Sequence, residues 1–448
     1  MRYLYERMRI LRVRGRERHP GEASGGLGAL GPVAVMLLAL AYAEPAGAAE
    51  PGDSLTVSLL TMGPGEHPFT KFGHSAIWVH DARSNRDEVY NFGTFAFESP
   101  TLLLDSVQGK LPYWLSVQSM SGTLATYREQ RRSLLASELE LTPAERLGLL
   151  DALRDNALPE HRYYRYDYYR DNCATRVRDA LDRVLGGRIH APHTGPARMS
   201  YREHTLRLVA DDPLLYAGLD LAVGRHTDAA ITFWDEGFLP ERLHDLVAQT
   251  TVVDAGQELP LIRGEHLLLP ARLPAPRAVP PNWRIRYWDV GLFFGGALAW
   301  LGVSSRRSLG ARRALFVASV ALGVPLGLLG LALAYLTFFS AHSAAAANYN
   351  VLLVPPWVLA LTVAGFAAWR NKSWAWSVAR WAALGAFSST VIALGIRLFG
   401  HQPQVNNQEL AVALPLWLGA AIAAQLAGPR RPAWARSVRA RADRDTPG

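Results

Sequence analysis

Five long apolar blocks in the second part of the chain constrain its fold more than any other feature. They run over 287–303, 314–339, 351–369, 377–399 and 410–427. A helix needs about 20 predominantly apolar residues to cross a bilayer, and each block is near that length. The pattern predicts an all-α transmembrane region over 287–427. A soluble bundle of hydrophobic helices is the alternative.

The loops between the blocks alternate in charge. Loop 304–313 carries four Arg, and loop 370–380 is also basic, whereas loops 340–350 and 400–409 contain no Lys or Arg. Basic loops stay on the cytoplasmic side of a membrane. The alternation therefore predicts a multi-pass membrane protein, with a cytoplasmic C-terminus and with the residues before 287 outside.

Both ends of the chain carry its excess charge of +8. Residues 1–18 hold seven Arg against two Glu, and 429–448 hold six Arg against two Asp. Such flanking charge is typical of membrane proteins and does not indicate a nucleic-acid partner. The apolar run 28–43, followed by small residues at 46–48, predicts a signal peptide within 1–49, with an uncleaved anchor as the alternative. Segment 428–448 is expected to be a basic cytoplasmic tail.

Between these parts, residues 50–259 have the pattern of an α+β domain. Alternating runs at 54–60, 75–80, 89–97 and 133–141 predict strands. Thr142, with Pro143 and Glu145 after it, predicts a helix start, because Thr at the N-cap and Glu three residues later form a capping box. A second helix is expected from Asp171 or Asn172 to about 185, before two glycines. Residues 260–286 are rich in proline and are predicted to be a linker.

Cys173 is the only cysteine in the chain, which excludes an internal disulfide and a multi-cysteine zinc site. Its place in the first turn of a predicted helix favours a reactive thiolate, because free backbone N–H groups and the helix dipole stabilise negative charge there. His74, at the start of a strand, is the best candidate base, and Asn91 on the next strand is the candidate that orients it. Structural roles for the cysteine and the histidine are the alternative. No metal or cofactor site is predicted.

Polar residues in the two uncharged loops lie on the same predicted side of the membrane as Cys173. Polar groups at the membrane ends of helices are candidate functional residues, and interfacial capping is the alternative. The candidates for substrate binding are His342, Asn348, Asn350 and Gln408, together with Asn172 beside the cysteine.

Several segments resemble one known family. They are FGHSAIWV (72–79), VYNFGTFAF (89–97), GKLPYWL (109–115), YRYDYYRDNCATRVRD (164–179) and HSAAAANYNVLLVPPW (342–357). These strings resemble the bacterial lipoprotein intramolecular transacylases typified by Lnb. The resemblance implies a permuted papain-like extracytoplasmic domain before the transmembrane bundle.

The same resemblance implies a reaction. An acyl chain would move from the glycerol 2-position of a diacylglyceryl lipoprotein to its N-terminal amine, through a thioester on Cys173 with His74 as the base. The expected partners are a lipoprotein or phospholipid acyl substrate and the lipid bilayer. A cell-envelope cysteine amidase or peptidase, and a non-catalytic envelope scaffold, remain as alternatives.

Overall fold

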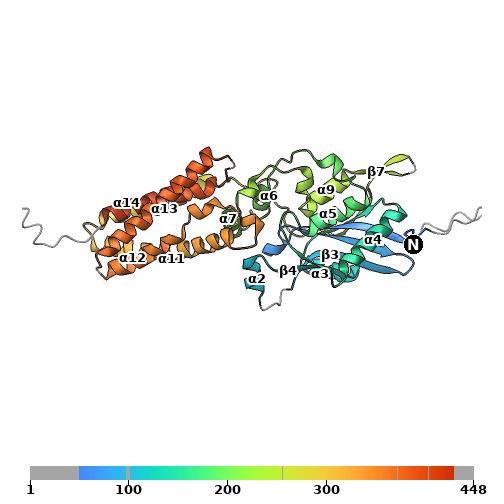
Figure 1. Cartoon of the computed structure of the whole chain (residues 1–448), viewed down its shortest axis with the longest axis horizontal. Coiled ribbons are helices and arrows are strands. Elements are labelled where there is room, and N and C mark those ends of the chain that lie inside the picture. Colours follow the sequence, from blue (N-terminus) through green and yellow to red (C-terminus); the bar gives the residue numbers. More distant parts are fainter. Residues whose placement is uncertain (1–49, 97–100, 255, 371, 402, 428–448) are drawn as a thin grey trace, which may run out of the picture. The chain divides into compact units, whose positions relative to one another are not determined.

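An antiparallel sheet of seven strands organises the first part of the chain (Figure 1). The computed structural model describes residues 50–427 except 97–100, 255, 371 and 402, so the predicted signal segment within 1–49 and the tail 428–448 lie outside the described residues. The sheet has the order β6-β4-β3-β2-β1-β5-β9. Its strands are β1 Leu55–Met62, β2 His74–Asp81, β3 Arg86–Thr94, β4 Pro112–Gln118, β5 Leu134–Leu139, β6 Tyr163–Arg165 and β9 Ile262–Leu269.

The predicted strands at 54–60, 75–80, 89–97 and 133–141 correspond to β1, β2, β3 and β5, but β3 ends at Thr94, and residues 95–96 already lie outside the strand. Strands β2 and β3 form a hairpin, in which Ile77 pairs with Tyr90 and Trp78 with Val89. Side chains alternate between the two faces of a strand, so odd and even positions enter different layers.

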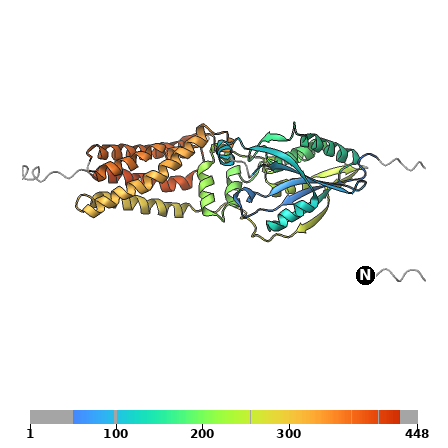
Figure 2. The same ribbon diagram turned by 90° about the horizontal axis from the view of Figure 1, so that it is seen from below.

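Each face of the sheet carries its own hydrophobic core. One face packs against helices α4 Pro143–Ala157, α5 Cys173–Val184 and α9 Pro240–Ala248. The other packs against α3 Met120–Glu129. Figure 2 shows the strands with helices on both sides.

The predicted helix starts are correct. The Thr142 hydroxyl accepts from the Glu145 backbone N–H, while the Glu145 carboxylate accepts from the Thr142 N–H, with Pro143 as the first helical residue of α4. Asn172 is the N-cap of α5, so Cys173 is the first residue of that helix.

The linker predicted over 260–286 is shorter in the structure. Residues Ile262–Leu269 form β9, an edge strand whose backbone pairs with β5. The alternating side chains of this segment allow it to join the sheet as a strand. Between α5 and this strand the described chain also forms α6 Tyr201–Leu208, α7 Pro213–Ala222, α8 Phe233–Glu236 and a hairpin of β7 Thr251–Asp254 with β8 Gln257–Pro260. A short helix, α2 Leu102–Gln108, precedes β4.

The second part of the described chain is helical. Its helices are α10 Arg284–Ser304, α11 Leu309–Phe338, α12 Leu359–Trp369, α13 Trp374–Phe399 and α14 Asn407–Leu426. In Figure 1, α11, α12, α13 and α14 lie side by side. Glycines allow close packing of α10 against α14: a Cβ on Gly295 would meet the Pro415 carbonyl oxygen at 2.0 Å.

Four segments of the described chain are long and apolar enough to cross a membrane: Leu309–Phe338, Tyr349–Trp369, Trp374–Phe399 and Asn407–Leu426. They correspond to four of the five predicted blocks. The first block forms helix α10, whose 21 residues give a length of about 31 Å at 1.5 Å per residue. It is not among these four segments, so its crossing of the membrane stays a prediction.

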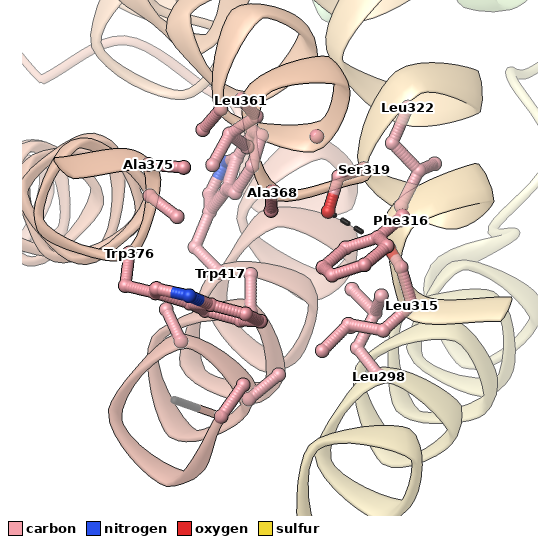
Figure 3. A pocket seen from close by; sticks show the side chains of 17 residues that line it. Leu298, Leu315, Phe316, Ser319, Leu322, Leu361, Ala368, Ala375, Trp376 and Trp417 are labelled. Atoms are coloured by element: carbon pink, nitrogen blue, oxygen red, sulfur yellow. Dashed lines mark hydrogen bonds between the residues drawn. The ribbon is translucent and has the colours of Figure 1, made fainter. Parts of the chain in front are cut away.

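The helical region encloses an apolar cavity of ≈ 50 Å³ (Figure 3). Phe316, Trp376 and Trp417 are among the residues that line it, and the Ser319 hydroxyl in its wall donates to the Leu315 carbonyl oxygen at 2.9 Å. None of the predicted site residues lies in this cavity, so it offers no group for the predicted chemistry.

Candidate active site

A cavity of ≈ 410 Å³ contains both residues that the sequence singles out. His74 and Cys173 lie in its wall. The wall also contains side chains from α7, from the C-terminal end of α11 and from the loop that follows α11. The members from the helical region are Leu336, His342, Ala344 and Ala345. The cavity is therefore built jointly by the sheet domain and the helical region.

The Cys173 thiol lies at the start of α5, where the first backbone N–H groups of a helix have no intrahelical partner. Burial raises the pKa of this thiol, while hydrogen bonds from the backbone N–H groups of Ser75 and Ala174, and the positive charge of Arg132, act in the opposite direction. The side chain is 9% exposed. At neutral pH the resting group is consequently a thiol, which has to lose its proton before it can attack.

The His74 ring is held by Asn91. The two side chains meet at 3.3 Å between His74 Nε2 and Asn91 Oδ1, and the Asn91 amide nitrogen donates to the Val89 carbonyl oxygen at 3.2 Å. Since Asn91 Oδ1 can only accept, His74 Nε2 carries the hydrogen, which leaves the lone pair on Nδ1. Burial lowers the pKa of His74 to about 4; Arg132 also lowers it, and the Asn91 hydrogen bond acts against both. The ring is therefore neutral at neutral pH and able to accept a proton.

The histidine and the cysteine are neighbours without being hydrogen-bonded. The Cys173 sulfur accepts from the backbone N–H of Ser75, the residue directly after His74. Within the described chain, the His74 ring has its hydrogen bond with Asn91 and none with the sulfur. The described residues therefore show no direct hydrogen bond between the candidate base and the candidate nucleophile. Both groups still face one cavity.

Gly93 brings the aromatic part of the cavity up to the cysteine. A Cβ on this glycine would lie 3.3 Å from the Tyr166 ring and 3.5 Å from Cys173 Cβ, and its φ of +86° is a conformation that favours glycine. Tyr166 and Cys173 therefore approach the same point of β3 from two directions.

Asn172 does not have a free side chain for a substrate, although the sequence made it a candidate for that role. Its Oδ1 accepts from the backbone N–H of Ala174 and Thr175 at 2.8 and 2.9 Å. Its Nδ2 donates to the carbonyl oxygens of Tyr168 and Phe238, both at 2.9 Å. These four bonds tie the start of α5 to two loops, so the structure gives Asn172 a positioning role.

His342 is the predicted outer-loop residue that the structure brings to the cysteine. Its Nε2 lies 2.7 Å from the Ser106 carbonyl oxygen, and its ring stacks on Tyr168 with centroids 5.8 Å apart. The turn at Gly109 fits closely around it, since a Cβ there would meet the His342 backbone N at 3.0 Å. Contacts with the sheet domain therefore fix this loop residue in the cavity wall.

The other three candidates lie outside that cavity. Asn348 donates to the Leu221 and Ala222 carbonyl oxygens, and Asn350 to those of Asp220 and Leu221. Gln408 donates to the Tyr216 hydroxyl and to Asp220 Oδ2. These bonds hold the outer loops of the helical region to the end of α7. Substrate binding by these residues is consequently not supported by their positions.

Two buried ion pairs stabilise the same junction between α7 and the outer loops of the helical region. Arg202, which is 2% exposed, pairs with Asp220 at 2.8 Å and with Asp228 at 2.7 Å. The Asp228 carboxylate also accepts from the Val405 backbone N–H at 3.1 Å.

Sequence reasoning missed several residues of the site. The buried Arg132 influences the ionisation of both His74 and Cys173, but nothing in its local sequence separates it from neighbouring arginines. Tyr166 and Tyr168 line the cavity, and the aromatic run at 163–169 was the signal that could have indicated them. Among the described residues, no cluster of three or more His, Cys, Asp or Glu side chains is arranged to hold a metal ion.

Comparison with known proteins gives a match in each of the two parts of the chain. Residues 44–211 match the Lnb N-terminal periplasmic domain, and residues 290–426 match the Lnb transmembrane domain. No curated protein and no solved structure gave a match. The first match includes His74 and Cys173, and the second includes the part of the helical region that lines their cavity, whereas residues 212–289 lie outside both matches. The chain is thus a membrane protein with an extracytoplasmic N-terminal domain, and it belongs to the Lnb family.

Proposed function

We propose that this protein is a membrane-bound cysteine acyltransferase that moves an acyl chain within diacylglyceryl lipoproteins, from the glycerol 2-position to the N-terminal amine. Family membership suggests a lipoprotein-modifying membrane enzyme. The observation that supports the finer proposal is the shared cavity, in which a first-turn cysteine and a neutral histidine meet side chains from the helical region.

The first step forms a thioester. His74 Nδ1 takes the Cys173 proton as the sulfur attacks the ester carbonyl carbon, and the backbone N–H groups at the start of α5 are donors available to the oxyanion. The ester C–O bond breaks, and the glycerol oxygen leaves with the proton from His74. Because burial raises the pKa of Cys173, the thiolate is not formed in advance, and the proton leaves the sulfur as the sulfur attacks.

In the second step the lipoprotein amine attacks the thioester carbonyl carbon. A C–N bond forms, the C–S bond breaks, and Cys173 is restored as a thiol. No oxidant, reductant or metal is needed. The cavity wall includes the apolar residues Leu336, Ala344 and Ala345 from the helical region. This supports a lipid substrate, because removing an acyl chain from the bilayer costs about 0.8 kcal/mol per CH₂ unless another apolar surface receives it. A peptidase that acts on soluble cell-wall peptides would have no need of such a wall.

This proposal places the chain in the inner membrane with the cavity on the outer side and the C-terminus in the cytoplasm, as the charges of the loops predict. It also keeps the permuted papain-like fold as the expected family architecture.

Mass spectrometry of lipoprotein N-terminal peptides tests the reaction. Cells with the wild-type gene are expected to show N-acylated lyso peptides, and cells with Cys173→Ala are expected to show diacylglyceryl peptides with a free amine. N-acylated peptides that keep both ester chains would overturn the intramolecular route in favour of a phospholipid donor, with the same chemistry at Cys173. Identical peptides in both strains would refute acyl transfer.

A further inference from the structure

A small second cavity opens beside the candidate active site. Its volume is ≈ 30 Å³, about twice the space that a buried water needs. Five of its residues also line the larger cavity: Phe69, Tyr113, Tyr166, Tyr168 and His342. Because the two cavities share a wall, a group bound in the smaller one lies next to the space in which the thioester would form. We call this smaller cavity the aromatic vestibule.

The rings of the aromatic vestibule form a continuous series. Tyr113 stacks on Tyr166 with centroids 4.2 Å apart, Tyr166 meets Tyr168 edge-on at 5.7 Å, and Tyr168 stacks on His342 at 5.8 Å. Burial and the neighbouring Asp167 carboxylate raise the pKa of Tyr168. These phenols stay neutral over the physiological range, so their rings are available to attract a cation.

A carboxylate completes the wall of the vestibule. Asp167 Oδ1 accepts from the backbone N–H of Tyr169 and Arg170, both at 3.0 Å, and Oδ2 accepts from the Ser343 hydroxyl. A carboxylate oxygen has two lone pairs, so Oδ1 is fully used and Oδ2 can accept one further hydrogen bond. The guanidinium of Arg165 donates to the Ala341 carbonyl oxygen at 2.6 Å, so it helps to hold the loop that carries His342.

The tautomer of His342 adds an acceptor. Its Nε2 faces the Ser106 carbonyl oxygen, which can only accept, so Nε2 carries the hydrogen and Nδ1 keeps a lone pair. The vestibule therefore combines π-faces, a carboxylate and an imidazole lone pair. Aromatic cages with a carboxylate are suited to ammonium groups.

We propose that the aromatic vestibule binds the N-terminal ammonium group of the acceptor lipoprotein and holds it beside the thioester on Cys173. This inference rests on the proposed acyl transfer and adds the acceptor site that the second step needs. Tyr168 and Asp167 hold the cation. An ammonium has to lose one proton before it can attack, and His342 Nδ1 accepts that proton. As the tetrahedral intermediate collapses, a second proton passes from nitrogen through His74 to the sulfur.

The test uses the full-length protein in detergent with two unreactive analogues of a dipalmitoylglyceryl-cysteine tetrapeptide, in which ether bonds replace both esters so that Cys173 has no carbonyl carbon to attack. One analogue carries a trimethylated amine, which keeps the charge, and the other an acetylated amine, which removes it. The wild-type protein is expected to be inhibited more strongly by the trimethylated analogue. Tyr168→Ala and Asp167→Asn are expected to lower this preference about 2- to 30-fold, the range of a single cation–π contact or exposed ion pair.

The ratio of the two inhibition constants is the readout because a general loss of folded protein does not change it. Tyr163→Ala is the matched control: Tyr163 is 53% exposed, meets the Trp114 ring at a tilted angle of 56° and lies outside both cavities, whereas Tyr168 is 44% exposed. This control is expected to keep the wild-type ratio.

A second readout separates the two steps. Intact-protein mass spectrometry during turnover is expected to show a larger acylated fraction of Cys173 in Tyr168→Ala and Asp167→Asn than in the wild-type protein, because these variants slow the second step more than the first. Equal inhibition by both analogues, or wild-type ratios in both variants, would overturn the vestibule assignment while leaving acyl transfer in place. Absence of any acyl–Cys173 species in the wild-type protein would instead refute the proposed function itself.

Discussion

Replacing Asn172 by Ala is the most informative test of how the site is held. The change removes the N-cap of α5 and leaves the Tyr168 and Phe238 carbonyl oxygens without their donor. Loss of an N-cap costs about 1 kcal/mol, and an unsatisfied buried acceptor about 1–2 kcal/mol. The side chain is 5% exposed, so water cannot readily replace it. The sum is a destabilisation of about 3–5 kcal/mol.

The lone cysteine supplies the assay. Cys173 is buried at the start of the same helix, so a bulky fluorogenic maleimide is expected to react with it much faster when this region opens. Heating full-length protein with the dye gives an apparent Tm. For a domain of this size about 2–4 °C is lost per kcal/mol, so Asn172→Ala is expected to lower the Tm by about 10 °C.

Two control variants isolate the cause. Asn172→Ser keeps a neutral capping oxygen and removes the amide that donates to the two carbonyl oxygens, so it is expected to fall between wild type and Asn172→Ala. Ser119→Ala removes an exposed cap, whose hydroxyl accepts from the Gly122 N–H at 3.2 Å and meets the Ser121 hydroxyl at 3.1 Å, and is expected to lower the Tm by less than about 4 °C. A wild-type Tm for Asn172→Ala together with lost activity would refute the positioning role and restore Asn172 as a substrate contact.

Three further predictions concern the thiol, the glycine beside it and the junction. Burial raises the pKa of Cys173, so iodoacetamide is expected to alkylate it in the native protein more slowly at pH 7 than it alkylates free cysteine. The rate of alkylation is expected to rise with pH, and rapid alkylation at pH 6 would contradict this. Gly93→Ala is expected to reduce turnover at least tenfold, because the added methyl group would crowd Cys173 and because Gly93 has a positive φ that alanine disfavours. The control Gly148→Ala adds a methyl group in open space, so it is expected to keep turnover and to raise the Tm slightly. Arg202→Met is expected to cost about 3–5 kcal/mol, because it leaves two buried carboxylates unpaired; an unchanged thermal transition in the maleimide assay would refute that value.

Local sequence signals explain why part of the site was predictable. Alternation in β2 and β3, with a short turn between them, is enough to bring Asn91 within reach of His74. The capping residue before Cys173 likewise fixes the start of α5. These features depend on neighbours close in sequence, so they can be derived without a tertiary structure.

Long-range contacts explain what was missed. Asn348 and Gln408 were assigned to substrate because they lie in uncharged loops, yet their partners belong to α7, more than 120 residues earlier. The proline-rich segment concealed β9, whose partner β5 is equally remote in sequence. The position of Arg132 near both reactive groups also depends on packing between distant elements. No local pattern contains that information.

The loop after α11 supplies part of the wall that faces Cys173. A secreted fragment ending before α10 would keep the sheet and the thiol, but its reaction chamber would stand open to water on that side. On the proposed function, insertion of the helices would therefore act as a maturation step, because the candidate nucleophile would gain this part of its wall only when the whole polypeptide has folded.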